Sequence, residues 1–281
     1  MSTRPVWPHP AFAHPAFVPF RALLARLPEF PEYADWERLG SPVCLPAGAP
    51  IRFVPPETIT LYYELAIASA GTVATRHHDW HDCFNAVIWH HFPHSKLAFN
   101  ALHQQEIERQ GSLTRRGPRR DAATLLDECG MLIASSDPAL LDALAQRNWS
   151  ALFKEEHWGV QISATIIGHA TLESLLAPFT GLTAKCVPVL VPEAFFTLPH
   201  TQQLRLLDRT LARALAAGWL ESPRQLPVLP WLGIPGWWPH QDPAFYADTT
   251  HFCPLRAGAA HGSTAAGKNP LTLAIHKADT P

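Results

Sequence analysis

The distribution of proline is the feature of this sequence that most restricts its fold. The 281-residue chain contains 28 prolines, roughly twice the average share. Because proline removes a backbone donor and interrupts helix interiors and central strands, regular elements have to lie between prolines. Residues 1–56 are interrupted most often, and we expect an extended arm there with short helices near 20–27 and 31–38.

The segments between the prolines carry both helical and strand patterns. Amphipathic spacing and capping residues predict helices at residues 57–69, 80–91, 95–110, 137–147 and 199–217 and around 168–176. Apolar runs predict a strand at 182–190 and a β-hairpin over residues 121–134. We therefore expect an α+β fold in which a helical layer, including a helical hairpin, packs on a small and mostly antiparallel sheet.

The same composition suggests how the chain is divided. We expect a proline-rich N-terminal arm at residues 1–50, a single globular domain at residues 51–256, and a flexible tail at residues 257–281. The tail is rich in glycine, alanine and serine, and such chain ends are often frayed.

Charge and cysteine usage exclude several classes of protein. The formal net charge is 22 − 24 = −2, which gives no global field to hold long nucleic acids. Five widely spaced cysteines without a CxxC pair argue against a disulfide framework and a cysteine zinc site. The first residues do not have the pattern of a secretory signal, and no apolar run is long enough for a membrane span. We expect a cytoplasmic protein without membrane contact, and these features leave its oligomeric state open.

Polar side chains of the predicted helical hairpin form the first candidate site. They are His81, Asp82 and Asn85 on the first helix and Lys96, Asn100 and His103 on the second. Spacings of three, four and seven residues place each set along one stripe of its helix. Facing stripes could bind a divalent metal ion through imidazole and carboxylate groups, or act as acid and base without one. The alternative is a buried structural network in which these groups satisfy one another.

Two further pairs offer similar chemistry. His169 and Glu173 are four residues apart on a predicted helix, so that one metal ion or one substrate could contact both. An ordinary surface salt bridge is the alternative. Asp127 and Glu128 could act as acid and base or bind Mg²⁺, although acidic residues before a glycine are also typical of turns.

A basic loop and an aromatic segment complete the candidates. The loop contains Arg115, Arg116, Arg119 and Arg120, and guanidinium groups bind phosphate bidentately; a solvated loop is the alternative. The aromatic segment 231–256 could cover a pocket, or could simply pack on the core. The chain has no GxGxxG after a strand, no Walker loop and no GxSxG elbow, so NAD-linked, P-loop and serine-hydrolase chemistry has no support.

Several of these segments together resemble one bacterial family. They read WHDCFNAVIWHHFPHSKLAFNALH, RRDAATLLDECG, IGHATLESLLAPFTGLTAK and LPWLGIPGWWP, followed by DPAFYADTTHFCPLR. In this order they resemble domain-of-unknown-function family 3025 over roughly residues 50–256. The resemblance implies a single family domain and implies no activity. The family pattern coincides with the polar positions named above and with one tryptophan. They are Trp80, His81, Asp82, Asn85, Lys96, Asn100, His103, Asp127, Glu128, His169 and Glu173.

The residues support one functional hypothesis and two rivals. The hypothesis is a metal-dependent hydrolase, with a phosphoester or other small molecule as substrate. The expected metal ligands are His81, Asp82, His103, His169 and Glu173. The expected catalytic residues are Asn85, Lys96, Asn100 and Glu128, and the expected substrate-binding residues are Arg119 and Arg120. The rivals are a non-catalytic binding or scaffold protein with a buried polar network, and a metal-free enzyme that uses His103 and Asp82 as acid and base.

Overall fold

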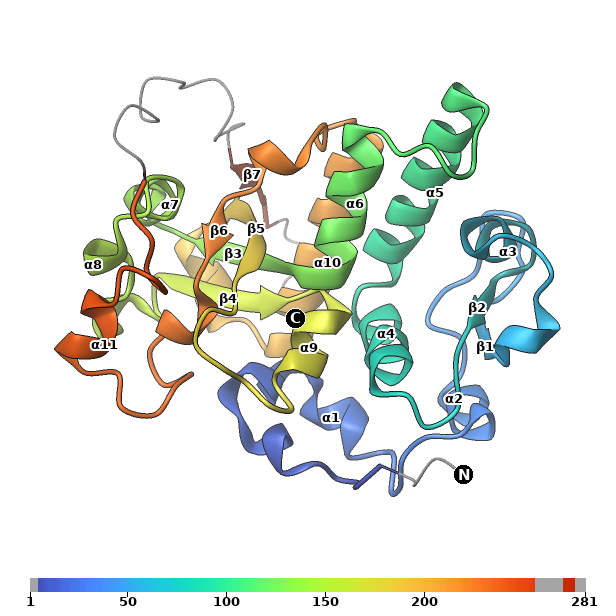
Figure 1. The fold of residues 1–281 in the computed structure, drawn as a ribbon, viewed down its shortest axis with the longest axis horizontal. Coiled ribbons are helices and arrows are strands. Elements are labelled where there is room, and N and C mark those ends of the chain that lie inside the picture. Colours follow the sequence, from blue (N-terminus) through green and yellow to red (C-terminus); the bar gives the residue numbers. More distant parts are fainter. Residues whose placement is uncertain (1–4, 256–269, 276–281) are drawn as a thin grey trace.

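A mixed β-sheet forms the centre of the molecule in the computed structural model, which describes residues 5–255 and 270–275 (Figure 1). In these residues the sheet has five strands in the order β4–β3–β5–β6, and β7 also pairs with β5. The strands are β3 (Gly130–Ser135), β4 (Ile162–Ile166), β5 (Ala184–Leu190), β6 (Val228–Leu229) and β7 (Leu271–Thr272). The α+β class is confirmed.

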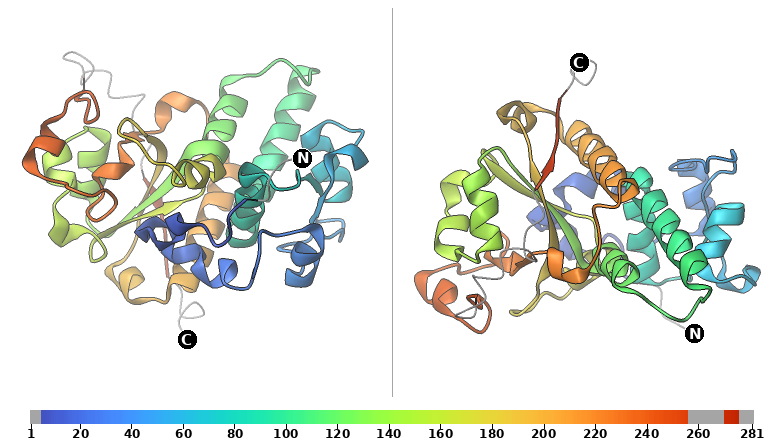
Figure 2. Two further views of the ribbon diagram at one scale, coloured as in Figure 1. Left: turned by 60° about the horizontal axis from the view of Figure 1, so that its bottom comes forward. Right: turned by 90° about the horizontal axis from the view of Figure 1, so that it is seen from above.

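The direction of the strands differs in part from the expected sheet. β3 pairs antiparallel with β4, and β5 pairs antiparallel with β6. However, β3 and β5 are parallel, as are β5 and β7. The predicted mostly antiparallel character is therefore confirmed only in part. Helices lie on both sides of the sheet (Figure 2), with α7 (Pro138–Ala145) on one side and α10 (His200–Ala216) on the other. Every residue of β3 is buried, as expected for a central strand covered on both faces.

The two helices predicted for the hairpin are present, as α4 (Trp80–His91) and α5 (Pro93–Gln110). Asp79 caps α4 by accepting the backbone N–H of Asp82, and Pro93 occupies the first turn of α5, where a missing N–H costs nothing. α5 packs along α10. None of the described helices combines the length and the apolar character that crossing a lipid bilayer requires.

The β-hairpin predicted over residues 121–134 is wrong. This segment is helix α6 (Pro118–Cys129), which runs directly into β3 at Gly130. Pro118 begins the helix, and Ala122, Ala123 and Leu126 form its buried face at helical spacing. The apolar run that suggested a first strand is too short for its period to decide between helix and strand. As a result, the Asp127–Glu128 pair lies in the last turn of a helix.

A small unit beside the hairpin completes the helical side of the molecule. β1 (Arg52–Val54) and β2 (Thr72–Ala74) form a parallel pair, and α3 (Tyr63–Ala70) connects them. The helix expected at residues 57–69 therefore exists but begins later, after a short 3₁₀ turn at Pro56–Thr58. The helices expected at 137–147, 168–176 and 199–217 correspond to α7, α9 (His169–Ser174) and α10.

The N-terminal arm packs on its own chain and contains the two predicted short helices, α1 (Arg21–Leu24) and α2 (Tyr33–Leu39). Phe17 and Phe20 are fully buried. The ring of Phe17 lies 5.8 Å from that of Phe84 in α4, and the ring of Phe20 lies 4.9 Å from that of His91. These aromatic contacts make the arm part of the main core. Most of the predicted C-terminal tail lies outside the described residues, but within it β7 pairs with β5.

The arm's packing gives the first prediction. Replacing Phe17 with Ala removes a fully buried ring and should lower the free energy of unfolding by about 3–5 kcal/mol. Val18, its neighbour, is 38% exposed, so Val18→Ala should change the free energy of unfolding by less than about 1 kcal/mol. Urea denaturation of both variants measures the difference. Equal stabilities of the two variants would contradict the arm's place in the core.

Candidate functional site

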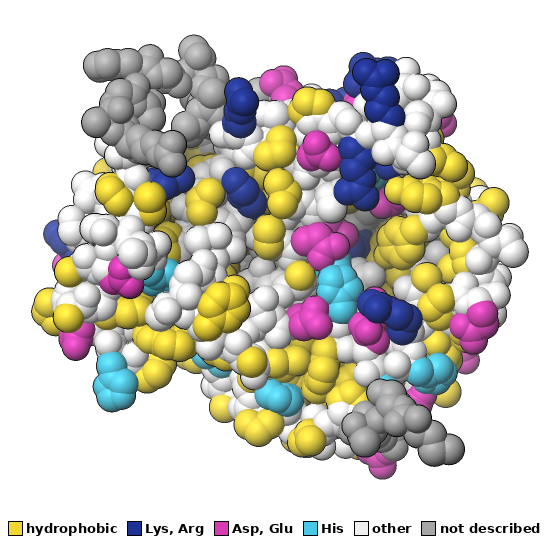
Figure 3. All heavy atoms as spheres, in the orientation of Figure 1, with side chains coloured by type: hydrophobic (Ala, Val, Ile, Leu, Met, Phe, Trp, Pro, Cys, Tyr) yellow, Lys and Arg dark blue, Asp and Glu magenta, His cyan; other side chains and the backbone are white. Residues whose placement is uncertain are grey.

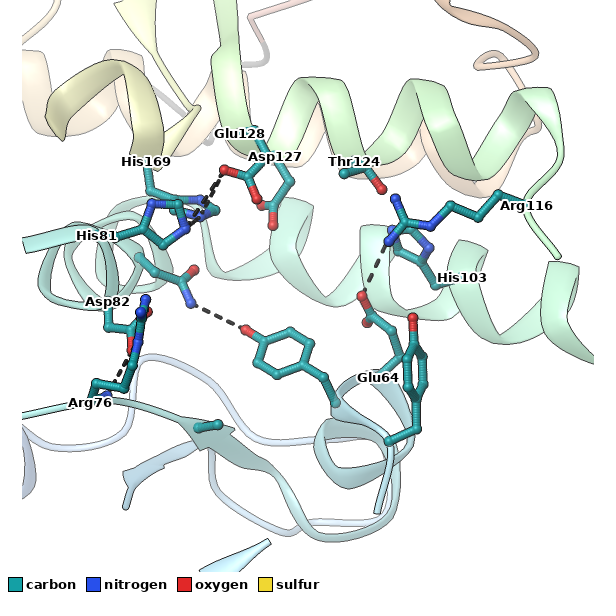
Figure 4. A pocket seen from close by; sticks show the side chains of 14 residues that line it. Glu64, Arg76, His81, Asp82, His103, Arg116, Thr124, Asp127, Glu128 and His169 are labelled. Carbon is teal, nitrogen blue, oxygen red and sulfur yellow. Dashed lines mark hydrogen bonds and ion pairs between the residues drawn. The ribbon is translucent and has the colours of Figure 1, made fainter. Parts of the chain in front are cut away.

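A polar pocket opens between α3, α4, α5, α6 and α9. Its volume is about 300 Å³, and histidine, acidic and basic side chains supply most of its lining. In Figure 3, acidic, histidine and basic side chains gather around a hollow in this face of the molecule. The close view shows two ends, with His81, Glu128 and His169 at one and His103, Arg116 and Glu64 at the other (Figure 4).

Three potential metal ligands meet at the first end. His81 lies in the first turn of α4, Glu128 in the last turn of α6, and His169 is the first residue of α9. The Nε2 atoms of the two histidines are 2.9 Å apart. One oxygen of Glu128, Oε2, lies 3.4 Å from Nε2 of His169 and 3.7 Å from Nε2 of His81. Among the described residues this is a group that could hold a metal ion.

Two glycines allow Glu128 and His169 to come together. The backbone N–H groups of Ile167 and Gly168 both donate to the carbonyl of Gly130, at 3.0 Å each. A Cβ on Gly168 would lie 2.4 Å from the Glu128 carbonyl oxygen and 2.4 Å from the Gly130 nitrogen. Neither backbone atom can yield as a flexible side chain would, so only glycine fits at position 168. The end of α6 and the start of α9 are thereby held in contact.

Hydrogen bonding directs His81 towards this group. Its Nδ1 donates to Oε2 of Glu173 at 2.9 Å, which leaves a lone pair on Nε2 facing His169 and Glu128. A carboxylate behind a histidine in this way is typical of metal-binding histidines. Glu173 therefore lies on the opposite ring nitrogen from the other two residues and does not join them as a direct ligand.

His169 has an unsatisfied atom that fits the same interpretation. Its Nε2 contacts Nε2 of His81, which carries a lone pair, so Nε2 of His169 donates in this contact and Nδ1 of His169 is unprotonated. That Nδ1 is buried and makes no hydrogen bond. Burial lowers the pKa of His169 to about 3, which keeps the ring neutral, the form that binds metal ions.

The separations fit a metal site. With metal–nitrogen bonds of about 2.0–2.1 Å, neighbouring ligand atoms are roughly 2.9 Å apart in an octahedron and roughly 3.3 Å apart in a tetrahedron. The observed separations are 2.9, 3.4 and 3.7 Å. Only small side-chain shifts would be needed for His81, Glu128 and His169 to share one ion.

A buried lysine supports this end of the pocket from behind. Nζ of Lys96 donates to Asp127 Oδ1 at 2.5 Å and to Asn85 Oδ1 at 2.8 Å. Lys96 itself is only 4% exposed and does not line the pocket. Burial acts to raise the pKa of Asp127, but Lys96, together with His169 and His103, outweighs it and holds this pKa below its usual value. Burial raises the pKa of Glu128.

Asp82 has a different partner from the one the sequence suggested. Arg76 donates to both its carboxylate oxygens, through Nε at 2.8 Å and Nη2 at 3.0 Å, and its backbone N–H donates as well, at 2.7 Å. Burial alone would raise the pKa of Asp82, but these bonds lower it. The carboxylate is thus occupied by Arg76, although it stays at the pocket wall.

Asn100 and His103 lie at the second end, with Glu64. Nδ2 of Asn100 donates to Oε2 of Glu64 at 2.6 Å. His103 Nε2 is 3.8 Å from Oε1 of the same carboxylate. Burial raises the pKa of Glu64 to about 7 and lowers that of His103 to about 4. His103 is therefore apart from His81 and His169.

The arginines of the basic loop also lie in different places, and only one of them reaches the pocket. Arg119 donates to Glu106 and to the carbonyl of Leu220, and Arg120 is fully buried. Neither lines the pocket, whereas Arg116 does. The aromatic segment packs on the core, with Trp231 and Trp237 buried, and contributes none of the pocket lining.

The structure thus brings together three of the residues selected from the sequence, His81, His169 and Glu128, but in changed combination. Glu128 joins the histidines, while Asp82, His103 and Glu173 do not. Sequence reasoning did not single out Tyr63 and Arg76, which line the pocket. Arg76 lies six residues before Asp82, in the loop that precedes α4. Helical spacing does not apply to a loop residue, so the sequence gave no indication that Arg76 would pair with Asp82.

Comparison with known proteins identifies the family. The profile of the family described as "Protein of unknown function (DUF3025)" matches residues 51–256. The chain belongs to this family. Neither the curated proteins nor the solved structures contain a match.

The contact at Gly168 gives a prediction. Gly168→Ala should force the α6–β3 and β4–α9 junctions apart and lower the free energy of unfolding by on the order of 1–3 kcal/mol. Ser174→Ala is the control in the same helix, because it removes only a hydrogen bond to the Ala170 carbonyl, and should cost less than about 1 kcal/mol. Urea denaturation compares them. A Gly168→Ala protein as stable as the control would show that the backbone contact is not required.

The buried Glu64 gives a prediction about pH. Its pKa of about 7 lies above its ordinary value, so the folded protein holds this proton more tightly than the unfolded chain does. The free energy of unfolding should therefore fall as pH rises from about 5 to about 8. Glu64→Gln should remove this contribution, on the order of 1–3 kcal/mol. The charged and titratable groups that act on Glu64 are Asp127, Lys96, Arg120 and His103.

Denaturation curves at several pH values test this. The difference between wild type and Glu64→Gln should increase with pH, in favour of the variant. Glu108→Gln, on the exposed face of α5, is the control and should follow the wild type. If the wild-type and Glu64→Gln curves run parallel across this range, Glu64 does not bind its proton as described.

Proposed function

We propose that the protein is a metal-dependent hydrolase in which His81, Glu128 and His169 hold the ion. The observation that carries this proposal is the meeting of three ligand atoms, from three different helices, at one end of a polar pocket. Two histidines and one carboxylate are the ligand set of several catalytic zinc sites, which keep another position for water or substrate. A bound ion would lower the pKa of a water molecule towards 7 and so provide a nucleophile at neutral pH.

Neighbouring side chains supply the remaining functions in this proposal. Glu173 orients His81 through its Nδ1. Asp127 lines the pocket with a depressed pKa, so it is ionised at neutral pH and can orient a water molecule by accepting a hydrogen bond from it. Lys96 is committed to Asp127 and Asn85, and we assign it to positioning Asp127. Asn85 also donates to the Tyr63 hydroxyl at 3.1 Å, which fixes the middle of the pocket wall.

A phosphoester is the substrate we propose. Arg116, rather than Arg119 or Arg120, is the loop arginine that lines the pocket. Its guanidinium can bind a phosphoryl oxygen of the substrate. Asn100 holds Glu64 and has a positioning role in this scheme.

The alternative is a non-catalytic binding or scaffold protein with a structural polar network. The bonds that connect Lys96, Asn85 and Asp127 favour it, because they join α4, α5 and α6 and are largely buried. This alternative differs in its expectation for metal: the protein would contain none, and substitutions at His81 would act on stability alone.

Metal content is therefore the decisive measurement. Elemental analysis of protein purified without added metal or chelator should find near-stoichiometric zinc, manganese or iron. His81→Ala and Glu128→Ala should remove it, because each deletes one of three ligands. Glu173→Gln should weaken binding by about 10–100-fold, as expected for a residue that orients a ligand.

A neighbouring histidine provides the control. His77 is more than half exposed and contacts Glu32, so His77→Ala should keep the wild-type metal content. If the wild-type protein contains no metal and is not stabilised against heat by any added divalent ion, the hydrolase proposal fails and the structural network remains.

A further inference from the structure

We propose that the second end of the pocket binds an anionic, oxygen-rich group of the substrate, either phosphoryl or carboxylate. The residues that would bind it are Arg116, Tyr62 and Thr124, with Arg120 buried behind them. The identification of this group as part of a substrate rests on the proposed hydrolase function. The anion site itself is inferred only from the contacts at this end of the pocket.

The first observation is a buried cation without a carboxylate partner. Arg120 has no solvent exposure, and among the described residues it forms no ion pair. Nη1 donates to the carbonyls of Leu113 and Arg115, at 3.2 and 3.0 Å, and Nε has no partner. Buried charges are normally paired. Because no carboxylate forms a close ion pair with it, the charge of Arg120 adds positive potential to this end of the pocket.

Arg120 also orients a donor into the pocket. Its Nη2 donates to the hydroxyl oxygen of Tyr62 at 3.2 Å. Because that oxygen already accepts a bond from Arg120, the Tyr62 hydroxyl hydrogen is directed elsewhere. Tyr62 lines the pocket, and so does Thr124, which follows Arg120 by one turn of α6. Two hydroxyl groups are thus placed to donate to an acceptor in the pocket.

Arg116 supplies the charge that faces the pocket. It lines this end beside His103 and Glu64 (Figure 4), and within the described residues it makes no hydrogen bond or ion pair. The other arginine of the pocket, Arg76, is held by Asp82 and Asp79. Arg116 is therefore the arginine free to engage a ligand, and a guanidinium matches phosphate and carboxylate oxygens in a bidentate geometry.

Glu64 is the acidic residue at this end, and its state is compatible with an anion. Its Oε2 accepts a hydrogen bond from Asn100. Burial raises its pKa to about 7, so it can be protonated at neutral pH. An arriving anion then meets a neutral carboxyl group instead of a full negative charge.

The test uses the full chain after treatment with a chelator, titrated with inorganic phosphate and, separately, with malonate at constant ionic strength. Calorimetry gives each dissociation constant. Arg116→Ala should weaken binding at least about tenfold, because it removes a charge-assisted bond. Tyr62→Phe should weaken it about fivefold. Arg115→Ala is the matched control, since Arg115 carries the same charge on the same loop without lining the pocket. It should change binding less than about twofold.

The variant His81→Ala separates this inference from the metal site. If the anion binds at the second end, His81→Ala should bind the probes as the wild type does, whatever its metal content. Binding of phosphate alone identifies a phosphoryl group, and binding of malonate alone identifies a carboxylate. The inference is overturned if the wild type binds neither probe saturably, if Arg116→Ala and Arg115→Ala behave alike, or if binding is lost in His81→Ala and kept in Arg116→Ala.

Discussion

A backbone contact between two chain junctions is the constraint on which the candidate site depends. α6 passes into β3 without a loop, and β4 passes into α9 through Gly168. The carbonyl of Gly130 accepts N–H groups from Ile167 and Gly168. This contact is between main-chain atoms. The distance between Glu128 and His169 is therefore set by the pairing of β3 with β4, and it depends little on which side chains surround it. The site thereby shares the rigidity of a fully buried central strand.

The third proposed ligand, His81, comes from a helix that the sheet does not fix directly. Buried polar bonds locate it instead. Lys96 on α5 reaches both Asn85 on α4 and Asp127 on α6, and its ammonium lies 5.5 Å from the ring of Trp89. A buried ion pair contributes little net stability, because the loss of hydration offsets the attraction. Its effect is on geometry, since any other orientation of the hairpin would leave the charges of Lys96 and Asp127 without partners.

The sequence was informative where a structure is determined locally. Asp79 and Asp137 cap the helices that their positions predict, because capping depends only on residues within one turn. The first strand predicted within residues 121–134 was wrong because the short apolar run at Leu125 and Leu126 suits helix and strand equally well, whereas the run after Gly130 is a strand as predicted. The group of His81, Glu128 and His169 could not be predicted in full, because His81 and His169 are 88 positions apart in the sequence. His103 follows Lys96 by seven residues, which is about 10 Å along a helix, and one polar stripe therefore reaches both ends of the pocket.

The two ends of this pocket have opposite charge. At the first end, three carboxylates, Asp127, Glu128 and Glu173, lie close to the histidines. Lys96 neutralises Asp127, but Glu128 and Glu173 form their ion pairs only with histidines among the described residues.

Two carboxylates without a lysine or arginine ion-pair partner among the described residues match a divalent cation in the sign of their charge. The second end has Arg116 and the buried Arg120, and its acidic residue has a pKa near neutrality. A molecule that presents an anionic group to the arginines and a polar, reactive bond to the histidine end would be held in one orientation by both fields. This arrangement of charge, more than any single side chain, favours the proposed ligand pocket over a network that only satisfies buried groups.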